Sequence, residues 1–416
     1  MIYKIAKPKK EIKGTIAVPA SKSESNRLLI IKSLCKEPFE IKNLSDSEDT
    51  KALQKILISE NKKSETVHDV GNAGTTMRFL TAYFATQPGV RTLTGSDRMK
   101  QRPIKILVDA LRQFGAKITY TEKEGFAPLK IEGTKLKGGE ITMDGNVSSQ
   151  YISALLLIAP QLGNGLTVKF SGTITSRPYI RMTLKIMETF GVISSFDLDT
   201  ITIASQQYQV KDKNFYYEIE ADRTAASYWY SMAAMAKETD LKLIGLKKNG
   251  LQGDAIVSDL FTLFGVKTEF TDNGVRLTKL QKKIYDFVFN FSDCPDLAQT
   301  MAVVVAALKI PAILTGLQTL RIKETDRIKA IQNELKKIAV IANEKETGSL
   351  EILLSYIFHP QTSPFSTYND HRMAMAFAPL ALMFNEIKIE NPDVVKKSYP
   401  GFWKDMRSVG FEITEE

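Results

Sequence analysis

The sequence predicts an α/β protein (α+β in its mixed sheets) with two domains, and two repeated patterns carry that prediction. In the first pattern a short polar segment leads directly into an apolar helix six times, with segments beginning at Pro19, Val70, Asp144, Glu220, Asp293 and Asn369. From the second segment onward the spacing is nearly constant, at about 75 residues, which is typical of a repeated structural unit. In the second pattern, amphipathic helices that mostly end in an apolar-Gly-apolar stop lie out of phase with the first set.

Short segments of alternating polarity between the helices predict strands, for example AKITYTE, LKIEG, EITMD and LTVKF. Each repeat therefore holds two helices and several strands, and we expect six βαβαββ-like units. Too few residues follow Asn369 for a whole unit, so we expect the two strands within residues 1–18 to complete the last one. The first unit is truncated, with only a polar stretch around SENKKSETVH after its second helix, and it should lack a strand hairpin.

Six units divide into two halves of three. We expect one domain from residues 1–20 plus 222–416, in which the N-terminal strands complete the C-terminal half. The second domain, residues 21–221, is inserted between those two parts. Helix N-termini attract anions, so the six helix starts would hold highly charged substrates if they converged on one cleft between the domains.

Composition excludes several classes of protein. Of 416 residues, 43% are hydrophobic, which suffices for two cores, yet no run approaches the length of a membrane span. The N-terminus MIYKIAKPKKEIKG has no signal-peptide core, and Cys35 and Cys294 show no metal-ligand spacing, so we expect a cytoplasmic protein. The net charge of +9 comes from dispersed bases and bases at helix starts, which suits small anions better than nucleic acid. Without a heptad pattern, a monomer is expected.

The polar segments carry the residue types that bind phosphates and carboxylates. In SKSESNR, Lys22, Ser23 and Arg27 supply a point cation, a hydroxyl donor and a planar fork within about one helical turn. In GNAGTTMR, Gly74 allows a close backbone approach to an anion. An ordinary helix cap or turn explains each segment equally well when it is taken alone.

Further candidates lie in three other segments. NVSSQ offers two hydroxyls and an amide, with helix capping as the alternative. In RIKETDRI a helix would bring Lys323, Glu324 and Arg327 to one side, the alternative being a surface salt-bridge ladder. Asp296, in DCPD, is a carboxylate in an apolar stretch and serves either as a first-turn acid or as a general base.

The combination of these motifs resembles a known family. SKSESNR, GNAGTTMRFL, RMKQRPI, DGNVSSQY, SRPYI, RIKETDR, NDHRMAM and KSYP, in this order, are similar to the 5-enolpyruvylshikimate-3-phosphate synthases across essentially the whole chain. The resemblance implies two inside-out α/β barrel domains, each with three units about a pseudo-threefold axis. It also implies transfer of the enolpyruvyl group of phosphoenolpyruvate to the 5-hydroxyl of shikimate 3-phosphate, a step of aromatic amino-acid biosynthesis, without a metal or organic cofactor. Thr319 departs from the pattern, since many members carry Asn there.

The resemblance also implies roles for individual residues. The residues expected to bind shikimate 3-phosphate are Lys22, Ser23, Arg27, Ser148, Ser149, Gln150, Ser176, Tyr179, Asp296 and Lys323. Those expected to bind phosphoenolpyruvate are Lys22, Gly74, Arg102, Gln150, Arg327, Arg372 and Lys397. The expected catalytic groups are Asp296, which accepts the proton of the 5-hydroxyl, and Glu324 with Lys22, which serve the methyl proton. His371 is expected to orient its neighbours.

Two alternatives belong to different classes. The sister enzyme, UDP-N-acetylglucosamine enolpyruvyl transferase, shares the chemistry, but its mobile loop usually carries a cysteine before an Arg-Pro pair, and GSDRMKQRP has none. A non-catalytic relative that only binds anions would keep the fold and lose turnover.

Overall fold

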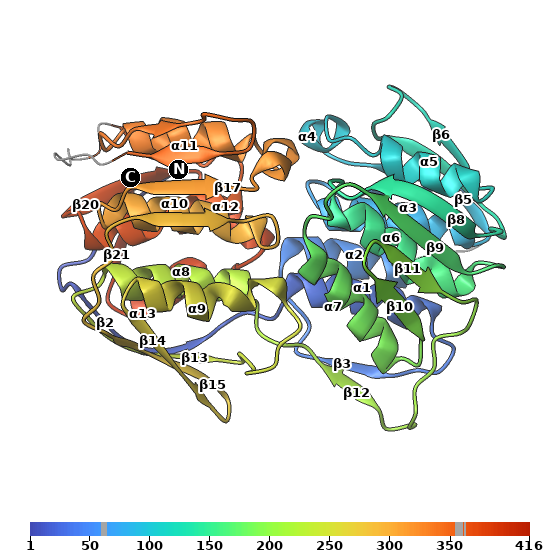
Figure 1. The fold of residues 1–416 in the computed structure, drawn as a ribbon, viewed down its shortest axis with the longest axis horizontal. Helices are drawn as coiled ribbons and strands as arrows, with labels where there is room; N and C mark the ends of the chain where they lie inside the picture. The colour runs from blue at the N-terminus through green and yellow to red at the C-terminus, as the bar shows by residue number, and fades with distance from the viewer. Residues whose placement is uncertain (60–64, 354–360, 362) are drawn as a thin grey trace. The chain divides into compact units, whose positions relative to one another are not determined.

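The computed structural model describes residues 1–59, 65–353, 361 and 363–416, and the chain divides into two compact units (Figure 1). The first unit comprises Met1–Ala20 and Glu220–Glu416, and the second is the continuous segment Ser21–Ile219. Residues 60–64, on which part of the expected polar stretch after the second helix falls, lie outside the described residues. No helix in the described ranges is long and apolar enough to cross a membrane.

The second unit alternates helices and strands. Its helices are α1 (Lys22–Leu34), α2 (Glu48–Ser59), α3 (Gly74–Thr86), α4 (Asp97–Lys100), α5 (Lys105–Gln113), α6 (Ser149–Ile158), the 3₁₀ helix η1 (Ala159–Gln161) and α7 (Arg177–Thr189). Its strands are β3 (Glu40–Lys42), β4 (Thr66–Asp69), β5 (Gly89–Thr94), β6 (Lys117–Tyr120), β7 (Leu129–Gly133), β8 (Gly139–Asp144), β9 (Leu166–Ser171), β10 (Ser194–Asp197), β11 (Thr200–Ile203) and β12 (Tyr216–Glu218).

The first unit is built in the same way. Its helices are α8 (Arg223–Met235), α9 (Val257–Leu263), α10 (Ala298–Ala307), α11 (Arg327–Lys336), α12 (His371–Phe377) and α13 (Phe402–Ser408). Its 3₁₀ helices are η2 (Gly253–Ile256), η3 (Pro295–Leu297), η4 (Gln318–Ile322), η5 (Ala378–Leu382) and η6 (Pro392–Lys397). Its strands are β1 (Ile2–Ala6), β2 (Glu11–Ala17), β13 (Glu238–Ile244), β14 (Val266–Thr271), β15 (Gly274–Lys279), β16 (Phe287–Asn290), β17 (Ala312–Thr315), β18 (Ala342–Asn343), β19 (Leu350–Ile352), β20 (Glu386–Glu390) and β21 (Glu412–Glu415).

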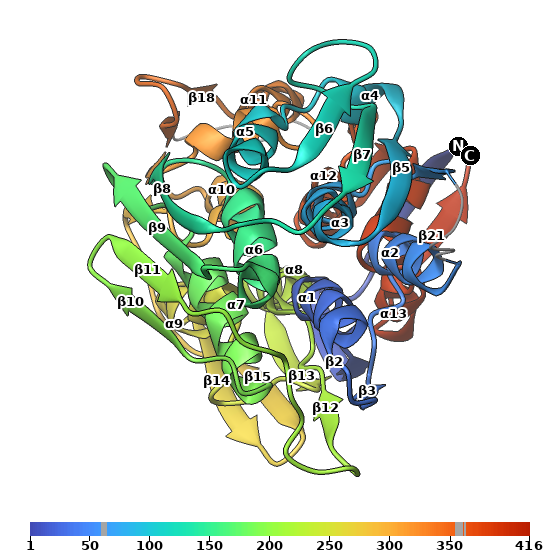
Figure 2. The ribbon, with the colours of Figure 1, turned by 90° about the vertical axis from the view of Figure 1, so that its right-hand side faces the viewer.

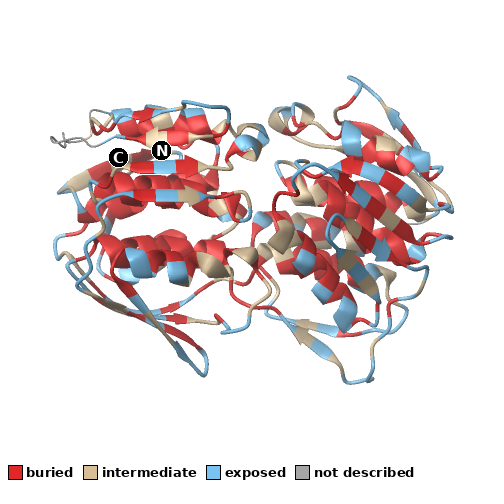
Figure 3. Ribbon diagram, in the orientation of Figure 1, coloured by how far each residue is buried: buried red, intermediate tan, exposed pale blue. Residues whose placement is uncertain are grey.

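The six polar segments lead into the helices at the centre of each unit. In the second unit α1, α3 and α6 pack against one another, and strands surround them on the outside (Figure 2). In the first unit α8, α10 and α12 form the corresponding trio. Every residue of α8 and of α10 is buried, which fits the mainly apolar composition of these two helices. Figure 3 shows that buried residues predominate in the helices of both units. Helices inside and sheets outside give the inside-out α/β arrangement that the sequence predicted.

Four of the sheets share one strand pattern. Each has a parallel pair followed by two antiparallel strands, in the orders β8-β9-β11-β10, β2-β13-β15-β14, β16-β17-β19-β18 and β4-β5-β7-β6. Burial alternates along the strands, as in β9, where Leu166, Val168 and Phe170 face the core. One face of each sheet therefore covers its pair of helices.

The two irregular sheets lie at the expected ends of the repeat. β1 lies between β20 and β21, so this N-terminal strand completes the last unit as expected. The expectation that both N-terminal strands complete the last unit is wrong for β2, because β2 pairs in parallel with β13 along its whole length and completes the sheet of the fourth repeat. The sheet of the first repeat has two described strands, β12 and β3, paired in parallel. The described part of this sheet contains no hairpin, which confirms that the first repeat is truncated.

Candidate active site

The first unit gathers two carboxylates and three cations in one cluster. Asp296 lies in η3, Arg327 is the first residue of α11, and Arg372 lies in the first turn of α12. Arg327 Nη1 donates to Asp296 Oδ1 at 3.0 Å, and Arg372 Nη2 donates to Asp296 Oδ2 at 2.8 Å. Each oxygen of Asp296 therefore has its own guanidinium partner, and 19% of the Asp296 side chain remains exposed.

Glu324 extends this cluster on the other side of Arg327. Its Oε2 accepts from Arg327 Nη2 at 2.9 Å, and its Oε1 accepts from Lys397 Nζ at 2.7 Å. A third carboxylate, Asp370, accepts from Arg327 Nε at 2.7 Å and caps the start of α12 through the Arg372 amide at 2.9 Å. Arg327 is thus held by three carboxylates, which fixes the plane of its guanidinium group.

Lys323 and Glu324 reach this cluster from a loop. The expectation that both share a helix with Arg327 is wrong, because η4 ends at Ile322 and α11 begins at Arg327. The physical reason is a cap: the Asp326 side chain accepts from the Lys329 amide at 3.1 Å, which starts the helix after both residues. Although Glu324 lies in a loop, its predicted contact with Arg327 is present.

Charge and burial set the protonation states of the cluster. Burial opposes ionisation of Asp296, but Arg372, Lys323 and Arg327 outweigh it, so the pKa of the Asp296 carboxyl lies well below its usual range. Burial lowers the pKa of Arg327, while Asp370, Glu324 and Asp296 raise it to a net value above the usual range. In this arrangement Asp296 is an ionised and firmly paired carboxylate, which makes it a weak base.

Another buried carboxyl lies close to this cluster. Asp254, in η2, is 2% exposed, and its Oδ2 accepts a hydrogen bond from Thr224 Oγ1 of α8. Burial, and then the charge of Asp296, raise the pKa of Asp254 to about 7. One turn along α8, Tyr228 Oη accepts from Arg372 Nη1 at 3.3 Å. Helix α8 therefore contacts Asp254 through Thr224 and Arg372 through Tyr228.

The polar segment at Glu220 forms a network of buried hydrogen bonds. Arg223 is 1% exposed, and its Nε donates to Glu220 Oε1 at 2.9 Å. Gln252 Nε2 donates to Glu220 Oε2 at 3.0 Å, and Gln252 Oε1 accepts from the Arg223 amide at 2.9 Å. These contacts join the start of α8 to the chain before η2. The segment, for which the sequence indicated no ligand, therefore has a structural role.

In the second unit the predicted residues lie at helix starts. Lys22 is the first residue of α1, and its Nζ lies 3.2 Å from Asp49 Oδ2 of α2. Gly74 begins α3 directly beneath the Arg102 guanidinium, where an added Cβ would lie 2.5 Å from Arg102 Nη1. Only glycine at position 74 lets Arg102 occupy that place.

The start of α6 adds a polar side chain beside α3. Gln150 Nε2 donates to Thr75 Oγ1 at 3.3 Å. Ser148 caps α6, with its Oγ accepting from the Gln150 amide at 3.4 Å, and Ser149 is the first helical residue. Ser176 precedes α7 in the left-handed region, at φ 55°.

Arg27 is a buried residue among the predicted ligands of the second unit. It is 4% exposed, and it donates to Thr183 Oγ1 at 2.7 Å, to Ser153 Oγ at 2.9 Å and to the Ser23 carbonyl at 2.8 Å. Burial lowers its pKa to about 10. These contacts hold α1 against α6 and α7, and Ser23 lies one turn before Arg27 on α1.

The structure thus brings Asp296, Glu324, Arg327, Arg372 and Lys397 together in the first unit. In the second unit the structure brings two predicted residues together, Gly74 and Arg102, while Lys22 contacts Asp49 and Gln150 contacts Thr75. Sequence reasoning did not find the supporting residues Asp49, Tyr228, Asp254 and Asp370. Asp370 had a detectable signal, since an Asp directly before the first residues of an apolar helix is a cap candidate.

Comparison with known proteins decides the family. A family model described as EPSP synthase (3-phosphoshikimate 1-carboxyvinyltransferase) matches residues 6–60 and 53–406. The chain belongs to the EPSP synthase family. The resemblance drawn from the motifs is therefore confirmed, and the family is that of EPSP synthase rather than that of its UDP-N-acetylglucosamine sister.

Similar members of the EPSP synthase family extend over the whole chain. A 3-phosphoshikimate 1-carboxyvinyltransferase of Bacteroides fragilis (strain YCH46) is 47% identical over 414 residues, covering 99% of each chain. The corresponding protein of Sulfurovum sp. (strain NBC37-1) is 36% identical, covering 97% of this chain and 98% of its own. An EPSP synthase structure from Acinetobacter baumannii covers 100% of both chains with a TM-score of 0.78 at 21% identity, which shows the shared fold.

Proposed function

We propose that the protein transfers the enolpyruvyl group of phosphoenolpyruvate to the 5-hydroxyl of shikimate 3-phosphate and releases inorganic phosphate, the sixth step of the shikimate pathway. The observation that carries this proposal is the cluster of Asp296 and Glu324 with Arg327, Arg372 and Lys397. Membership in the EPSP synthase family supports it. We also infer a cytoplasmic monomer that acts on these two small substrates, without nucleic acid or membrane partners.

Phosphoenolpyruvate supplies the charges that this cluster suits. Its carboxylate and phosphate carry negative charge that Arg327, Arg372 and Lys397 would pair with, and guanidinium groups bind such anions through two hydrogen bonds. Lys22, Gly74, Arg102 and Gln150 would complete this site from the second unit. Shikimate 3-phosphate would contact Lys22, Ser23, Arg27, Ser148, Ser149, Gln150, Ser176, Asp296 and Lys323.

Substrate binding would also prepare the base. In this structure Asp296 is paired with Arg327 and Arg372 at 3.0 and 2.8 Å, and both hold its pKa down. When the anionic substrate takes a share of these guanidinium groups, it removes part of the charge that stabilises the Asp296 carboxylate. The pKa of Asp296 then rises toward a range where it can accept a proton.

The reaction proceeds by addition and elimination. The 5-hydroxyl oxygen attacks C2 of phosphoenolpyruvate while its proton passes to Asp296, and C3 receives a proton from Glu324 or Lys22. The resulting tetrahedral ketal loses phosphate as the bond between C2 and the phosphate oxygen breaks. Asp296 gives its proton to that departing oxygen, and a proton of the C3 methyl group returns to the same acid-base group. Lys397 and Arg327, both paired with Glu324, keep that carboxylate in place between the two steps.

An assay of phosphate release from the purified protein with both substrates tests the proposal. Asp296→Asn keeps the shape and removes the base, so we expect kcat to fall about 10³-fold. Asp293→Asn, which alters the exposed carboxylate three residues earlier, is the matched control and should keep full activity. Binding of each substrate without any phosphate release by the native protein would instead support the non-catalytic anion-binding relative. Full activity of Asp296→Asn would refute the assignment of the base.

A further inference from the structure

The chain directly before α12 connects three elements of the first unit. Tyr368 Oη donates to Glu334 Oε1 of α11 at 2.7 Å. Asn391 Nδ2, at the N-cap of η6, donates to Asn369 Oδ1 at 2.8 Å. Asp370 is the N-cap of α12 itself. Three consecutive residues therefore contact α11, η6 and the start of α12.

Each of these three elements carries one cation of the candidate site. Arg327 begins α11, Arg372 lies in the first turn of α12, and Lys397 ends η6. Asp370 contacts two of these residues directly, since it accepts from Arg327 Nε at 2.7 Å and from the Arg372 amide at 2.9 Å. The segment 368–370 is therefore bonded to every element of the first unit that carries a cation predicted to bind phosphoenolpyruvate.

The backbone of this segment is strained. Tyr368 and Asn369 both lie in the left-handed region, at φ 52° and 55°, and so does Asn391, at φ 44°. Asparagine adopts this conformation readily, but a bulky side chain such as that of tyrosine adopts it only at an energetic cost. A glycine at the first position would avoid that cost. The tyrosine side chain therefore provides an interaction that offsets the strain, and its hydrogen bond to Glu334 is that interaction.

Glu334 is a well-fixed acceptor for this hydrogen bond. It lies about two turns after Arg327, on the same side of α11, and it is fully buried. Its Oε2 accepts from the Ser366 amide at 2.9 Å and lies 2.8 Å from Lys337 Nζ, so its Oε1 is directed to Tyr368. Burial, and then the contact with Glu334, raise the pKa of Tyr368 to about 12. The Tyr368 hydroxyl therefore stays protonated, and able to donate, at neutral pH.

We propose that Tyr368 and Asn369 are positioning residues for phosphoenolpyruvate. They hold the three cations of the first unit, Arg327, Arg372 and Lys397, at the spacing that fits its carboxylate and phosphate, an assignment that rests on the proposed function. Two anionic groups on one small molecule require cations at fixed separations, because hydrogen bonds weaken steeply when donor and acceptor are misplaced.

Backbone strain that surrounding contacts hold in place is found at binding sites, where it keeps groups in position before the ligand arrives. Without the Tyr368 hydroxyl the left-handed backbone loses the contact that offsets its cost. The segment then relaxes, and Asp370 moves together with the two arginines that it contacts.

The experiment compares the two substrates in the full-length protein. Tyr368→Phe removes the hydroxyl and keeps the ring. Calorimetric titration gives the Kd of each substrate alone, and steady-state kinetics gives each KM. We expect both constants for phosphoenolpyruvate to rise about tenfold. Those for shikimate 3-phosphate should change less than about twofold, because most of its predicted ligands lie in the second unit.

A second variant tests the same segment at an exposed position. Asn391→Gly keeps the left-handed backbone and removes only the donor to Asn369, so it retains the fold even if Tyr368→Phe does not. It should raise the constants for phosphoenolpyruvate about threefold and leave those for shikimate 3-phosphate unchanged.

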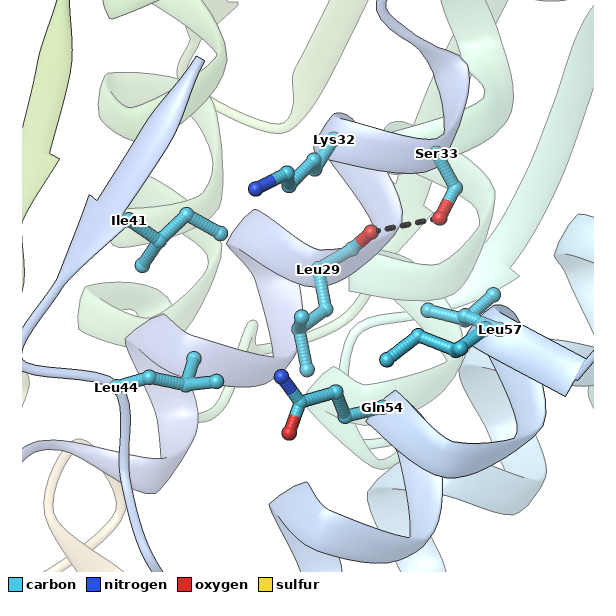
Figure 4. Close-up of a pocket in the computed structure, with 8 residues that line it drawn as sticks. Leu29, Lys32, Ser33, Ile41, Leu44, Gln54 and Leu57 are labelled. Atoms are coloured by element: carbon cyan, nitrogen blue, oxygen red, sulfur yellow. Dashed lines mark hydrogen bonds between the residues drawn. The ribbon is translucent and has the colours of Figure 1, made fainter. Parts of the chain in front are cut away.

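Two control variants remove hydrogen bonds away from the cations. Tyr230 Oη accepts from Thr268 Oγ1 at 3.2 Å, so Tyr230→Phe removes a buried tyrosine hydroxyl from the same unit. In the second unit, Ser33 Oγ donates to the Leu29 carbonyl at 3.0 Å beside an aliphatic pocket of about 260 Å³ (Figure 4). None of the residues that line this pocket is a predicted ligand. Tyr230→Phe and Ser33→Ala should therefore leave the constants for both substrates unchanged.

Several outcomes would overturn the proposal. Native constants for phosphoenolpyruvate in both Tyr368→Phe and Asn391→Gly would show that the segment positions no cation. Equal increases for the two substrates, or an equal increase in Tyr230→Phe, would show a general loosening of the unit instead. A native protein that binds phosphoenolpyruvate but releases no phosphate would refute the proposed function alone, and the Kd values would still test the positioning. A native protein that does not bind phosphoenolpyruvate would overturn both.

Discussion

The substitution Asp254→Asn tests whether the buried carboxyl beside the cluster is held in its protonated form. Asn preserves the shape and the oxygen that accepts from Thr224, and it imitates the neutral acid. The pKa of Asp254 is raised from 3.8 to about 7, first by burial and then by Asp296 and Asp222, against the opposing effects of Thr224 and Arg372. A native pKa above the unfolded value means that unfolding releases a proton between about pH 4 and pH 7. The free energy of unfolding therefore falls as the pH rises through this window.

The magnitude follows from the same values. A difference of about three pH units, at about 1.4 kcal/mol each, amounts to about 4 kcal/mol for complete ionisation. Relative to the native protein, Asp254→Asn should be stabilised by up to about 4 kcal/mol at pH 8, and by about zero at pH 4. The two proteins share all their other titrating groups, so the difference between them reports Asp254 together with its interaction with Asp296.

The assay is urea unfolding followed by tryptophan fluorescence. Both tryptophans of the sequence, Trp229 and Trp403, are buried in the first unit, so the signal reports the unit that contains Asp254. Asp259→Asn, at an exposed carboxylate of the adjacent helix α9, is the matched control and should show no such pH-dependent gain. An equal effect of Asp254→Asn at pH 4 and pH 8 would refute the reasoning, since the native carboxyl would then ionise like an unfolded one.

Three further predictions concern other contacts. Asp49→Asn removes the carboxylate that lies 3.2 Å from Lys22 Nζ, and steady-state kinetics should show about a tenfold loss in kcat/KM; an unchanged value would exclude a positioning role. Burial, and then nearby carboxylates, raise the pKa of the Cys294 thiol. A disulfide reagent at pH 8 should therefore label Cys294 only after denaturation. Rapid labelling of both cysteines in the folded protein would contradict this. Glu334 is fully buried and accepts hydrogen bonds from Tyr368 Oη at 2.7 Å and from the Ser366 amide at 2.9 Å. Glu334→Gln should therefore lower the free energy of unfolding by about 2 kcal/mol in the same fluorescence assay. A loss within error would show that solvent replaces these hydrogen bonds.

The repeat made most of the fold predictable from the sequence. Constant spacing located the helices, and the family resemblance implied the inside-out arrangement in which α8 and α10 are buried along their whole length. The short first repeat and the short last repeat predicted where strands would be missing or supplied from elsewhere. Such arguments succeed because periodicity and length are properties of the chain itself.

The contacts that support the site were harder to predict from the sequence. Asp254 and Asp49 resemble ordinary first-turn residues in the sequence, and their importance arises from burial beside Thr224 and Lys22. Glu324 was assigned to a helix with Arg327 because the two residues are three positions apart, whereas the Asp326 cap starts the helix after Glu324. Pairings between residues far apart in the chain depend on packing, which a single sequence does not specify.

The position of β1 constrains the order in which the protein can fold. Residues 2–6 pair with residues 386–390 and 412–415, so the first unit cannot complete its last sheet until nearly the whole chain has left the ribosome. The second unit needs only residues 21–219 and can form its three-helix centre during synthesis. The early-made β1 must wait for distant partners, and loop closure of that length slows folding. During synthesis the inserted unit therefore matures before the unit that encloses it in sequence.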